Sequence, residues 1–425
     1  MIRPFVRRAL KSVLVRNAAW LFAGQGFSFV AQGLYFIMLA RLLGTTQYGL
    51  LAGAVAMVAV VSQYSALGSG LLFLRYVSPD HTLFRIYWGN VLMSVFLLGT
   101  LLVVGLRLSG RWLVGAASVP LIFPIAMGDC LFQQLNSCAG QVFQAFEKMK
   151  FSAALTLLSN VSRCILALGM LAVLGRASAF QWATASLAVS AASACVAVAT
   201  VTRFFGLPSF SPSLFINRSG EGFVFAISGS TTAVYNDIDK VVLSHFGMDR
   251  ANGVYSMAYR VVNIGTMPIM SIVGAAFPRF FREGVKGIAA TVPMARSLLR
   301  RTAALGIAVS AAMFVCAPLI PHLVGKSFAE SASALRWLCL IPLFRCFHLS
   351  AGDAIAGAGH QKFRLVSQSI AAFGNLLLNL YLIPRYSWHG AAWASLATDG
   401  ALGVMNWLAL ILLSKRPAPL LQTVD

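Results

Sequence analysis

The sequence predicts an all-α integral membrane protein with about twelve transmembrane helices in two six-helix lobes. The first observation is composition: the chain is 58% hydrophobic, its mean hydropathy is +0.78, and only 11% of its 425 residues are charged. Soluble proteins carry about 25% charged residues. The second is the recurrence, roughly every 35 residues, of apolar runs long enough to cross a bilayer. The third is that short motifs of the first half recur in the second.

Each expected helix is an apolar run of roughly 20 residues or more. The runs are 17–39, 48–73, 88–106, 113–138, 151–174 and 182–202, then 222–246, 253–277, 302–323, 334–356, 364–384 and 390–413. The first run follows a basic start, as in a signal peptide, but it is too long and has no small-residue cleavage site. The chain therefore divides into a basic segment 1–16, an N-lobe 17–203, a linker 204–221, a C-lobe 222–413 and a tail 414–425.

The distribution of basic residues predicts the orientation. With the N-terminus inside, the inner segments hold about three times as many Lys and Arg residues as the outer ones. We therefore expect both termini to be cytoplasmic. Much of the net charge of +21 then anchors the protein to the anionic inner leaflet.

Three pairs of motifs indicate an internal repeat. LLGTTQYG (42–49) resembles HFGMDRANG (245–253), QAFEKMKF (144–151) matches AGAGHQKF (356–363), and TASLAVS (184–190) matches WASLATD (393–399). The pairs occur in the same order and at similar offsets. Because six spans per half give both halves the same orientation, the pattern predicts a parallel repeat.

One segment, from Ser228 to Tyr259, is polar although it lies among apolar runs. As a helix it places Asn236 and Lys240 on one stripe, with Thr232, Tyr235 and Asp239 beside it. A charge near the bilayer centre costs about 2.5–3.5 kcal/mol on insertion scales. We therefore expect this helix to line a polar cavity rather than face lipid.

Four basic residues lie inside predicted spans, and a fifth ends the first span: Arg163, Lys240, Arg260, Arg345 and Arg41. Such groups could pair with acids and hold helices together, as Lys240 could with Asp237 or Asp239. They could also bind an anion, for which Arg is well suited. Arg41 could equally extend to the membrane interface. Asn160 and Asn375 could bind sugar hydroxyls or bridge helices.

Other classes of site are not expected. The seven cysteines form no CxxC pair and the six histidines no HExxH motif, so we expect no metal site and no bound cofactor. The basic excess would suggest nucleic acid in a soluble domain, but the apolar spans leave no domain to bind it. Asp237-Ile-Asp239 resembles the DxD motif of glycosyltransferases. Since it lies within a span and the outer loops are short, we expect no enzyme.

Several motifs resemble a known family. ARLLGTTQYG (40–49), DKVVLSHFG (239–247) followed by GVYSMAYR (253–260), and AFPRFF (276–281) are similar to the polysaccharide exporters of the multidrug/oligosaccharidyl-lipid/polysaccharide (MOP) superfamily. The resemblance is greatest to Wzx-type O-antigen flippases and covers essentially the whole chain. It implies a MATE-like fold of two six-helix lobes.

The resemblance also implies a function. Such proteins use alternating access to move an undecaprenyl-diphosphate-linked oligosaccharide (an O-antigen or exopolysaccharide unit) across the bacterial inner membrane, through a cationic cavity. Membrane lipids, a polysaccharide polymerase and glycosyltransferases are the implied partners. Asp239, Lys240, Arg260 and Arg41 match family motifs, whereas Arg163 and Arg345 are supported only by their place in the spans. Asp239 or Asp237 could couple transport to H⁺ or Na⁺.

A second function is open within the same superfamily. A MATE-type drug or cation antiporter would have a cavity with net negative charge, whereas the charges inside the predicted spans are mainly positive. A membrane glycosyltransferase or polymerase is the third and weakest alternative.

Overall fold

The computed structural model describes the backbone of residues 13–415 and the side chains of residues 31–415. Most of the basic segment 1–16 and of the tail 414–425 thus lies outside the described residues. Within the described part every element is helical, which confirms the all-α prediction.

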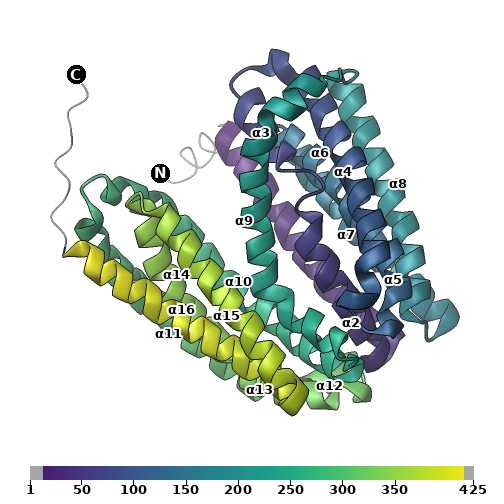
Figure 1. Cartoon of the computed structure of the whole chain (residues 1–425), viewed down its shortest axis with the longest axis vertical. Helices are drawn as coiled ribbons and strands as arrows, with labels where there is room; N and C mark the ends of the chain where they lie inside the picture. The colour runs from purple at the N-terminus through teal and green to yellow at the C-terminus, as the bar shows by residue number, and fades with distance from the viewer. Residues whose placement is uncertain (1–12, 416–425) are drawn as a thin grey trace, which may run out of the picture. The chain divides into compact units, whose positions relative to one another are not determined.

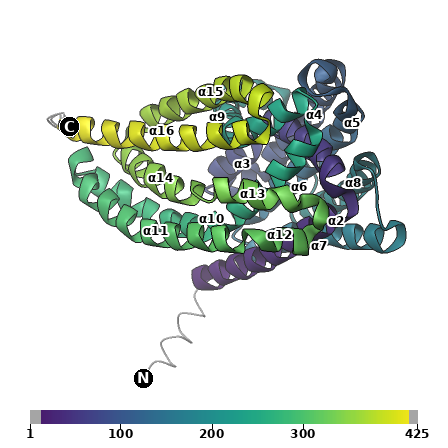
Figure 2. The same ribbon diagram turned by 90° about the horizontal axis from the view of Figure 1, so that it is seen from below.

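The helices of the first half are α2 (Val13–Ser62), α3 (Ser69–Val77), α4 (Phe84–Leu113), α5 (Val119–Ala126), the π-helical segment η3 (Met127–Gln133), α6 (Gln134–Ala145), α7 (Met149–Leu174) and α8 (Ala179–Phe205). Those of the second half are α9 (Pro212–His245), α10 (Asp249–Gly284), α11 (Ile288–Cys316), α12 (Ile320–Val324), α13 (Ala329–Leu338), α14 (Ile341–Gly357), α15 (Gln361–Tyr386) and α16 (Trp388–Ser414). Figures 1 and 2 show them in two views.

Ten helices in the described part are long and apolar enough to cross a membrane. Two expected spans are missing from this number. α2 is counted once although it holds two of the expected spans, joined at a kink, and α9 is not counted because it is too polar to meet the hydropathy criterion. The kink lies at Gly44, whose φ of 67° is a left-handed conformation that glycine adopts without a steric penalty. Residues 13–415 therefore account for twelve expected spans, six in each half, of a multi-pass membrane protein.

Left-handed backbone positions confirm the internal repeat. Gly44 corresponds to Gly247, Glu147 to Gly359, and Gly175 to Ser387, and all six have a positive φ. The helices between them match as well, since α7 and α15 are both 26 residues long. The two halves of the sequence thus fold into the same series of helices and turns.

The chain forms two compact units, Met1–Ala233 and Val234–Asp425. We call them the N-unit and the C-unit. In the N-unit, Phe73, Trp88 and Phe143 are central members of the apolar core of α3, α4, α6 and α8. In the C-unit, α14 packs against α10, α11 and α16.

The expected linker 204–221 is partly helical, because α9 begins at Pro212. Proline is well tolerated in the first turn of a helix, and the Ser211 hydroxyl accepts a hydrogen bond from the Leu214 amide at 3.5 Å. The polar residues that resemble a loop contact the end of α3 instead. Glu221 accepts hydrogen bonds from Arg75 and Tyr76, the latter at 3.0 Å.

Outward-facing positions are apolar, as lipid contact requires. Large side chains such as Leu101 (66% exposed), Val173 (83%) and Val315 (73%) are mostly exposed. A soluble monomer rarely exposes large contiguous apolar patches. These side chains are suited to the hydrocarbon core of a bilayer.

Candidate functional site

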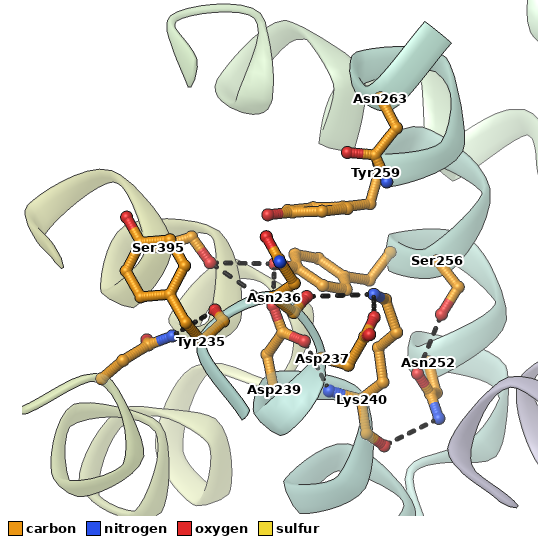
Figure 3. A network of polar contacts seen from close by, with 12 residues as sticks. Tyr235, Asn236, Asp237, Asp239, Lys240, Asn252, Ser256, Tyr259, Asn263 and Ser395 are labelled. Carbon is orange, nitrogen blue, oxygen red and sulfur yellow. Dashed lines mark hydrogen bonds and ion pairs between the residues drawn. The ribbon is translucent and has the colours of Figure 1, made fainter. Parts of the chain in front are cut away.

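A network of charged and aromatic side chains lies inside the C-unit (Figure 3). We call it the C-unit network. It includes Tyr235, Asp237, Asp239 and Lys240 from α9, Tyr255, Tyr259 and Asn263 from α10, Arg345 from α14, Asn375 from α15, and Ser395 and Asp399 from α16. The part of the predicted polar stripe from Tyr235 to Lys240 enters this network, whereas Thr232 is exposed.

Lys240 is compensated by a carboxylate on its own helix. Its ammonium forms an ion pair with Asp237 three residues earlier and donates to the Asn236 carbonyl at 3.2 Å. It also lies 4.6 Å from the centroid of the Tyr259 ring, within the range of a cation–π contact. Only 8% of Lys240 is exposed, so its charge is held within protein and away from lipid.

Asp239 is buried and hydrogen-bonded without an ion pair in the described part of the chain. Only 1% of the residue is exposed. Its carboxylate accepts hydrogen bonds from the Tyr255 hydroxyl, the Ser395 hydroxyl at 3.4 Å and the Lys240 amide at 2.7 Å. Tyr255 and Ser395 also contact each other at 2.9 Å, so the acid is held by groups from α10 and α16.

Asp399 is the second buried carboxylate bonded by a tyrosine. It accepts a hydrogen bond from the Tyr235 hydroxyl and interacts electrostatically with Arg345. The Tyr235 carbonyl accepts from the Asn375 amide at 3.5 Å. α9, α15 and α16 thus meet at one polar position.

The Arg345 guanidinium is held by neutral acceptors of α10. It donates to Asn263 and Thr266, both at 3.3 Å, and to the Tyr259 hydroxyl at 3.2 Å. The sequence offered no acid within one helical turn of Arg345. The structure supplies Asp399 from another helix.

Arg163 occupies a separate polar position in the N-unit. Its Nη2 donates to the Gln133 side chain at 3.3 Å and to the Ser190 hydroxyl at 3.1 Å. Gln133 ends the π-helical segment η3 and Ser190 lies on α8. Nearby, the Asn136 amide donates to the Ser193 hydroxyl at 2.9 Å.

The remaining predicted residues lie elsewhere in the two units. Arg41 is exposed, and Asn160 is half-buried on α7 one turn before Arg163. Thr232 is exposed and donates to the Ser228 carbonyl of its own helix at 3.0 Å. Arg260 is half-buried on α10, directly after Tyr259. The C-unit thus brings together Tyr235, Asp237, Asp239, Lys240, Arg345 and Asn375, whereas Arg41, Asn160, Arg163 and Thr232 belong to the N-unit.

Several members of the C-unit network, among them Tyr255, Tyr259, Ser395 and Asp399, were not among the site residues predicted from the sequence. Tyr255 and Tyr259 belong to the GVYSMAYR motif, where their spacing of four residues places both on one helix face. Asp399 ends the WASLATD motif, whereas its counterpart in TASLAVS is Ser190. A carboxylate that is present in only one copy of the repeat was therefore the sequence signal that could have identified Asp399 as a site residue.

The chemistry of the C-unit network combines three carboxylates with two cations. Two of the carboxylates, on Asp239 and Asp399, are buried and each accepts a hydrogen bond from a tyrosine hydroxyl. Ionisable groups inside a membrane protein commonly mark proton or ion pathways. In the described residues no group of three or more His, Cys, Asp or Glu side chains is placed to hold a metal ion.

Comparison with protein families identifies one match. A family model described as "Polysaccharide biosynthesis protein" matches residues 14–283. No curated protein matches the chain.

Solved structures of MOP-superfamily transporters have the same fold. The lipid II flippase MurJ in an inward closed conformation superposes with a TM-score of 0.69 at 14% identity, covering 93% of this chain and 87% of that one. An inward-facing multidrug resistance MATE family transporter gives 0.65 at 15% identity, covering 93% and 96%. The outward-facing conformation of such a transporter gives 0.59 at 15% identity, covering 96% and 99%. The predicted MOP-type fold is thereby confirmed.

Proposed function

Because the chain belongs to the polysaccharide biosynthesis protein family, we propose that it is an alternating-access flippase for a polyprenyl-diphosphate-linked oligosaccharide. The oligosaccharide is an O-antigen or exopolysaccharide unit, as in Wzx-type proteins. The transporter works in the bacterial inner membrane with both termini in the cytoplasm, alongside a polymerase and glycosyltransferases.

The observation that carries this proposal is a guanidinium kept inside an apolar helix with only neutral hydrogen-bond partners. Arg163 lies on α7, whose sequence is otherwise strongly apolar, and donates to Gln133 and Ser190. A cation in the bilayer is costly. The Asp129 carboxylate on η3 interacts electrostatically with Arg163 but forms no ion pair with it in the described part of the chain, so the guanidinium is available to a further anion. The diphosphate of a polyprenyl carrier is such an anion, and its lipid tail can stay in the bilayer.

Further cations and amides complete the proposed cationic cavity. Arg41, Lys240, Arg260 and Arg345 supply positive charge, and Asn160, Asn236 and Asn375 supply neutral groups for sugar hydroxyls. Lys240 already forms an ion pair with Asp237, so we assign it a smaller share of diphosphate binding. Tyr235 and Thr232 are further polar groups of the proposed lining.

Coupling to an ion is assigned to the buried acids of the C-unit network. Asp239 and Asp399 each accept a hydrogen bond from a tyrosine, so either acid could take up H⁺ or Na⁺ in exchange for these contacts. The half-buried side chain of Asp237 forms an ion pair with Lys240 and so lowers the net positive charge beside the two buried acids.

A drug or cation antiporter is the second candidate, and the same network is the observation that favours it. The C-unit network holds three carboxylates, on Asp237, Asp239 and Asp399, against the two cations of Lys240 and Arg345, so the acids outnumber the bases by one within this network. The family match favours the flippase, since it describes polysaccharide biosynthesis.

A deletion strain distinguishes the two functions. We expect loss of surface glycan, together with lipid-linked oligosaccharide that accumulates on the cytoplasmic leaflet, and recovery of both when the wild-type gene is restored. Normal surface glycan combined with greater sensitivity to cationic dyes would instead identify an antiporter.

A further inference from the structure

The repeat places Gln47 of the N-unit and Arg250 of the C-unit at the same position. Each lies three residues after a glycine with φ of 67°, Gly44 in the first copy and Gly247 in the second. The starts of α8 and α16 correspond as well, because the motifs TASLAVS and WASLATD lie at the same distance from them. The two copies can therefore be compared residue by residue at this end of each unit.

In the N-unit the turn is joined to the start of α8 by hydrogen bonds. The Gln47 side chain accepts one from the Ala179 amide at 2.8 Å, which satisfies an N–H group in the first turn of the helix. The Leu42 carbonyl accepts another from the Ala177 amide at 3.1 Å. The turn and the helix start thus close onto each other.

In the C-unit Arg250 binds a different partner. Its guanidinium forms an ion pair with Glu330 of α13 at 2.7 Å. Among the described residues, no hydrogen bond joins residues 247–251 to residues 387–389 at the start of α16. The contact that closes the first copy of the repeat is therefore missing from the second.

A pocket of about 500 Å³ lies between these two segments. It is lined by residues 247–251, by Glu330 and by residues 387–389, which all belong to the C-unit. Ligand sites commonly have volumes of about 300–1,000 Å³. In the proposed orientation the pocket lies at the outer end of the C-unit, because residues 247–251 follow the seventh span.

Asp249 supplies an acceptor in the wall of the pocket. Its Oδ1 atom is buried and has no hydrogen-bond partner in the described part of the chain. Burial of a carboxylate oxygen without a partner is costly, so this atom points to a ligand group that donates to it. The start of α16 offers the opposite kind of group, because its first turn has N–H donors and no side-chain cap.

Aromatic rings form another part of the wall. The rings of Trp388 and His389 both line the pocket and stack with their centroids 3.6 Å apart. The Trp393 ring lies 6.1 Å from that of His389 and 6.0 Å from that of Trp337. The face of an aromatic ring is negatively polarised, so it suits the C–H face of a sugar ring.

The charges around the pocket favour an uncharged ligand. Arg250 and Glu330 compensate each other, which leaves the carboxylate of Asp249. An anion would suit the N–H donors of α16 but would be repelled by Asp249, and a cation would suit Asp249 but not those donors. A hydroxyl group both donates and accepts hydrogen bonds, so it is compatible with both.

We propose that this pocket binds a neutral sugar residue. A sugar hydroxyl donates to the Asp249 carboxylate and a hydroxyl accepts from the first turn of α16, while the ring packs against His389. The sugar belongs to the glycan that the flippase carries, so its source rests on the proposed function, whereas the sugar site itself does not. The pocket thus holds the glycan at the outer end of the C-unit and contributes to the choice of sugar.

Three variants test the site, and one variant serves as a matched control. Asp249→Ala removes the acceptor, His389→Ala removes the ring, and Arg250→Gln introduces the residue that closes the first copy of the repeat. The control is His322→Ala. His322 is an exposed histidine of α12 that hydrogen-bonds the Pro318 carbonyl at 3.0 Å and does not line the pocket.

Binding is measured by tryptophan fluorescence of the purified full chain in nanodiscs, since the sugar headgroup of a maltoside detergent would compete. The probes are the oligosaccharide released by mild acid from the lipid-linked glycan of the deletion strain, and the methyl glycosides of glucose, galactose and mannose. We expect Asp249→Ala to weaken binding about ten- to a hundredfold, the range for a hydrogen bond to a charged group. His389→Ala and Arg250→Gln should weaken it about tenfold or more, whereas His322→Ala should bind like the wild type.

Competition identifies the chemistry of the ligand. Neither inorganic phosphate nor tetramethylammonium should displace the sugar. Displacement by phosphate would make the pocket an anion site at the start of α16, and displacement by tetramethylammonium would make it a cation site at Asp249. Either result would overturn the assignment to a neutral sugar.

Other results would refute the sugar site or the flippase separately. If the wild type binds none of the probes, or if Asp249→Ala and His389→Ala both bind as well as His322→Ala, the pocket is not a sugar site. Either result, in a strain that still exports glycan, leaves the flippase proposal intact. A deletion strain without lipid-linked glycan would contradict the flippase, and the methyl glycosides would then decide the pocket alone. Should Asp249→Ala not fold, His389→Ala and Arg250→Gln decide by the same measurement.

Discussion

The contact between α9 and the turn before α3 depends on the absence of a side chain at Gly222. A Cβ atom there would lie 2.1 Å from the Leu67 carbonyl oxygen and 3.2 Å from its carbon. The opposing Gly68, with φ of +63°, is also tightly packed, since its Cβ would meet the Gly222 oxygen at 2.8 Å. Both partners are backbone, so neither can rotate away.

The magnitude of Gly222→Ala follows from these distances. The backbones would have to separate by about 1 Å to bring the 2.1 Å contact to the 3.0 Å that real Cβ atoms reach. Overpacking of this kind costs about 1–3 kcal/mol, and we take the upper end because backbone must move. Alanine in place of glycine offsets about 1 kcal/mol of this cost, because alanine has the higher helix propensity. The net loss of unfolding free energy is therefore about 2 kcal/mol.

Gly220→Ala is the matched control. Gly220 lies on the same helix as Gly222, but a Cβ atom at Gly220 would meet nothing within 4 Å. This substitution should leave stability unchanged or raise it by about 0.5–1 kcal/mol. The unfolding free energy of each purified variant is measured by denaturant titration in mixed micelles under the same conditions. Equal stability of the two variants would refute the close packing of α9 on this turn.

Two further substitutions test charged and polar contacts of the C-unit. Arg364 pairs with the Asp353 carboxylate at 2.8 Å, and only 6% of the Asp353 side chain is exposed. Arg364→Gln should therefore lower the unfolding free energy by about 3–5 kcal/mol in the same titration. Adding Asp353→Asn should recover most of this loss. A double variant as unstable as the single variant would contradict the expected pairing. Tyr255→Phe removes the hydroxyl that donates to Asp239, and it should reduce stimulation of transport by a proton or sodium gradient while leaving undecaprenyl diphosphate binding intact. Tyr381→Phe on the exposed face of α15 is the control, and equal stimulation in both variants would exclude Asp239 from coupling.

Composition and hydropathy were sufficient to predict the helical membrane fold. Apolar runs placed α7, α8, α15 and α16 within a few residues, and the repeat motifs marked the turns where Gly44, Gly247 and Gly359 adopt left-handed backbone. The expected span 48–73 was wrong in part, because the helix is interrupted between Ser62 and Ser69, and α11 begins at Ile288, well before the expected 302. The start of α9 could not be found in this way. Its first turns are polar because Glu221 and Arg218 contact α3 rather than lipid, and a hydropathy profile treats such residues as a loop.

The candidate site was predicted only in part, because pairing depends on which helices meet. The sequence showed that Lys240 could pair with Asp237, since the two are three residues apart on one helix. It could not show that Asp399 approaches Arg345 and Tyr235, because that depends on the packing of α16 against its neighbours. Nor did it reveal the π-helical segment that carries Gln133, for which no sequence signal is known to us in this chain.

Translocation by purified protein is the most direct test of the proposed function. The full chain is reconstituted in proteoliposomes with a fluorescent undecaprenyl-diphosphate-linked oligosaccharide in both leaflets, and an impermeant glycosidase reports which leaflet holds the glycan. The flippase proposal predicts that the protected fraction becomes accessible in the presence of wild-type protein, and far more slowly with Arg163→Gln, which removes the guanidinium assigned to the diphosphate. A protected fraction that stays the same with wild-type protein as in protein-free vesicles, with and without an ion gradient, would contradict it.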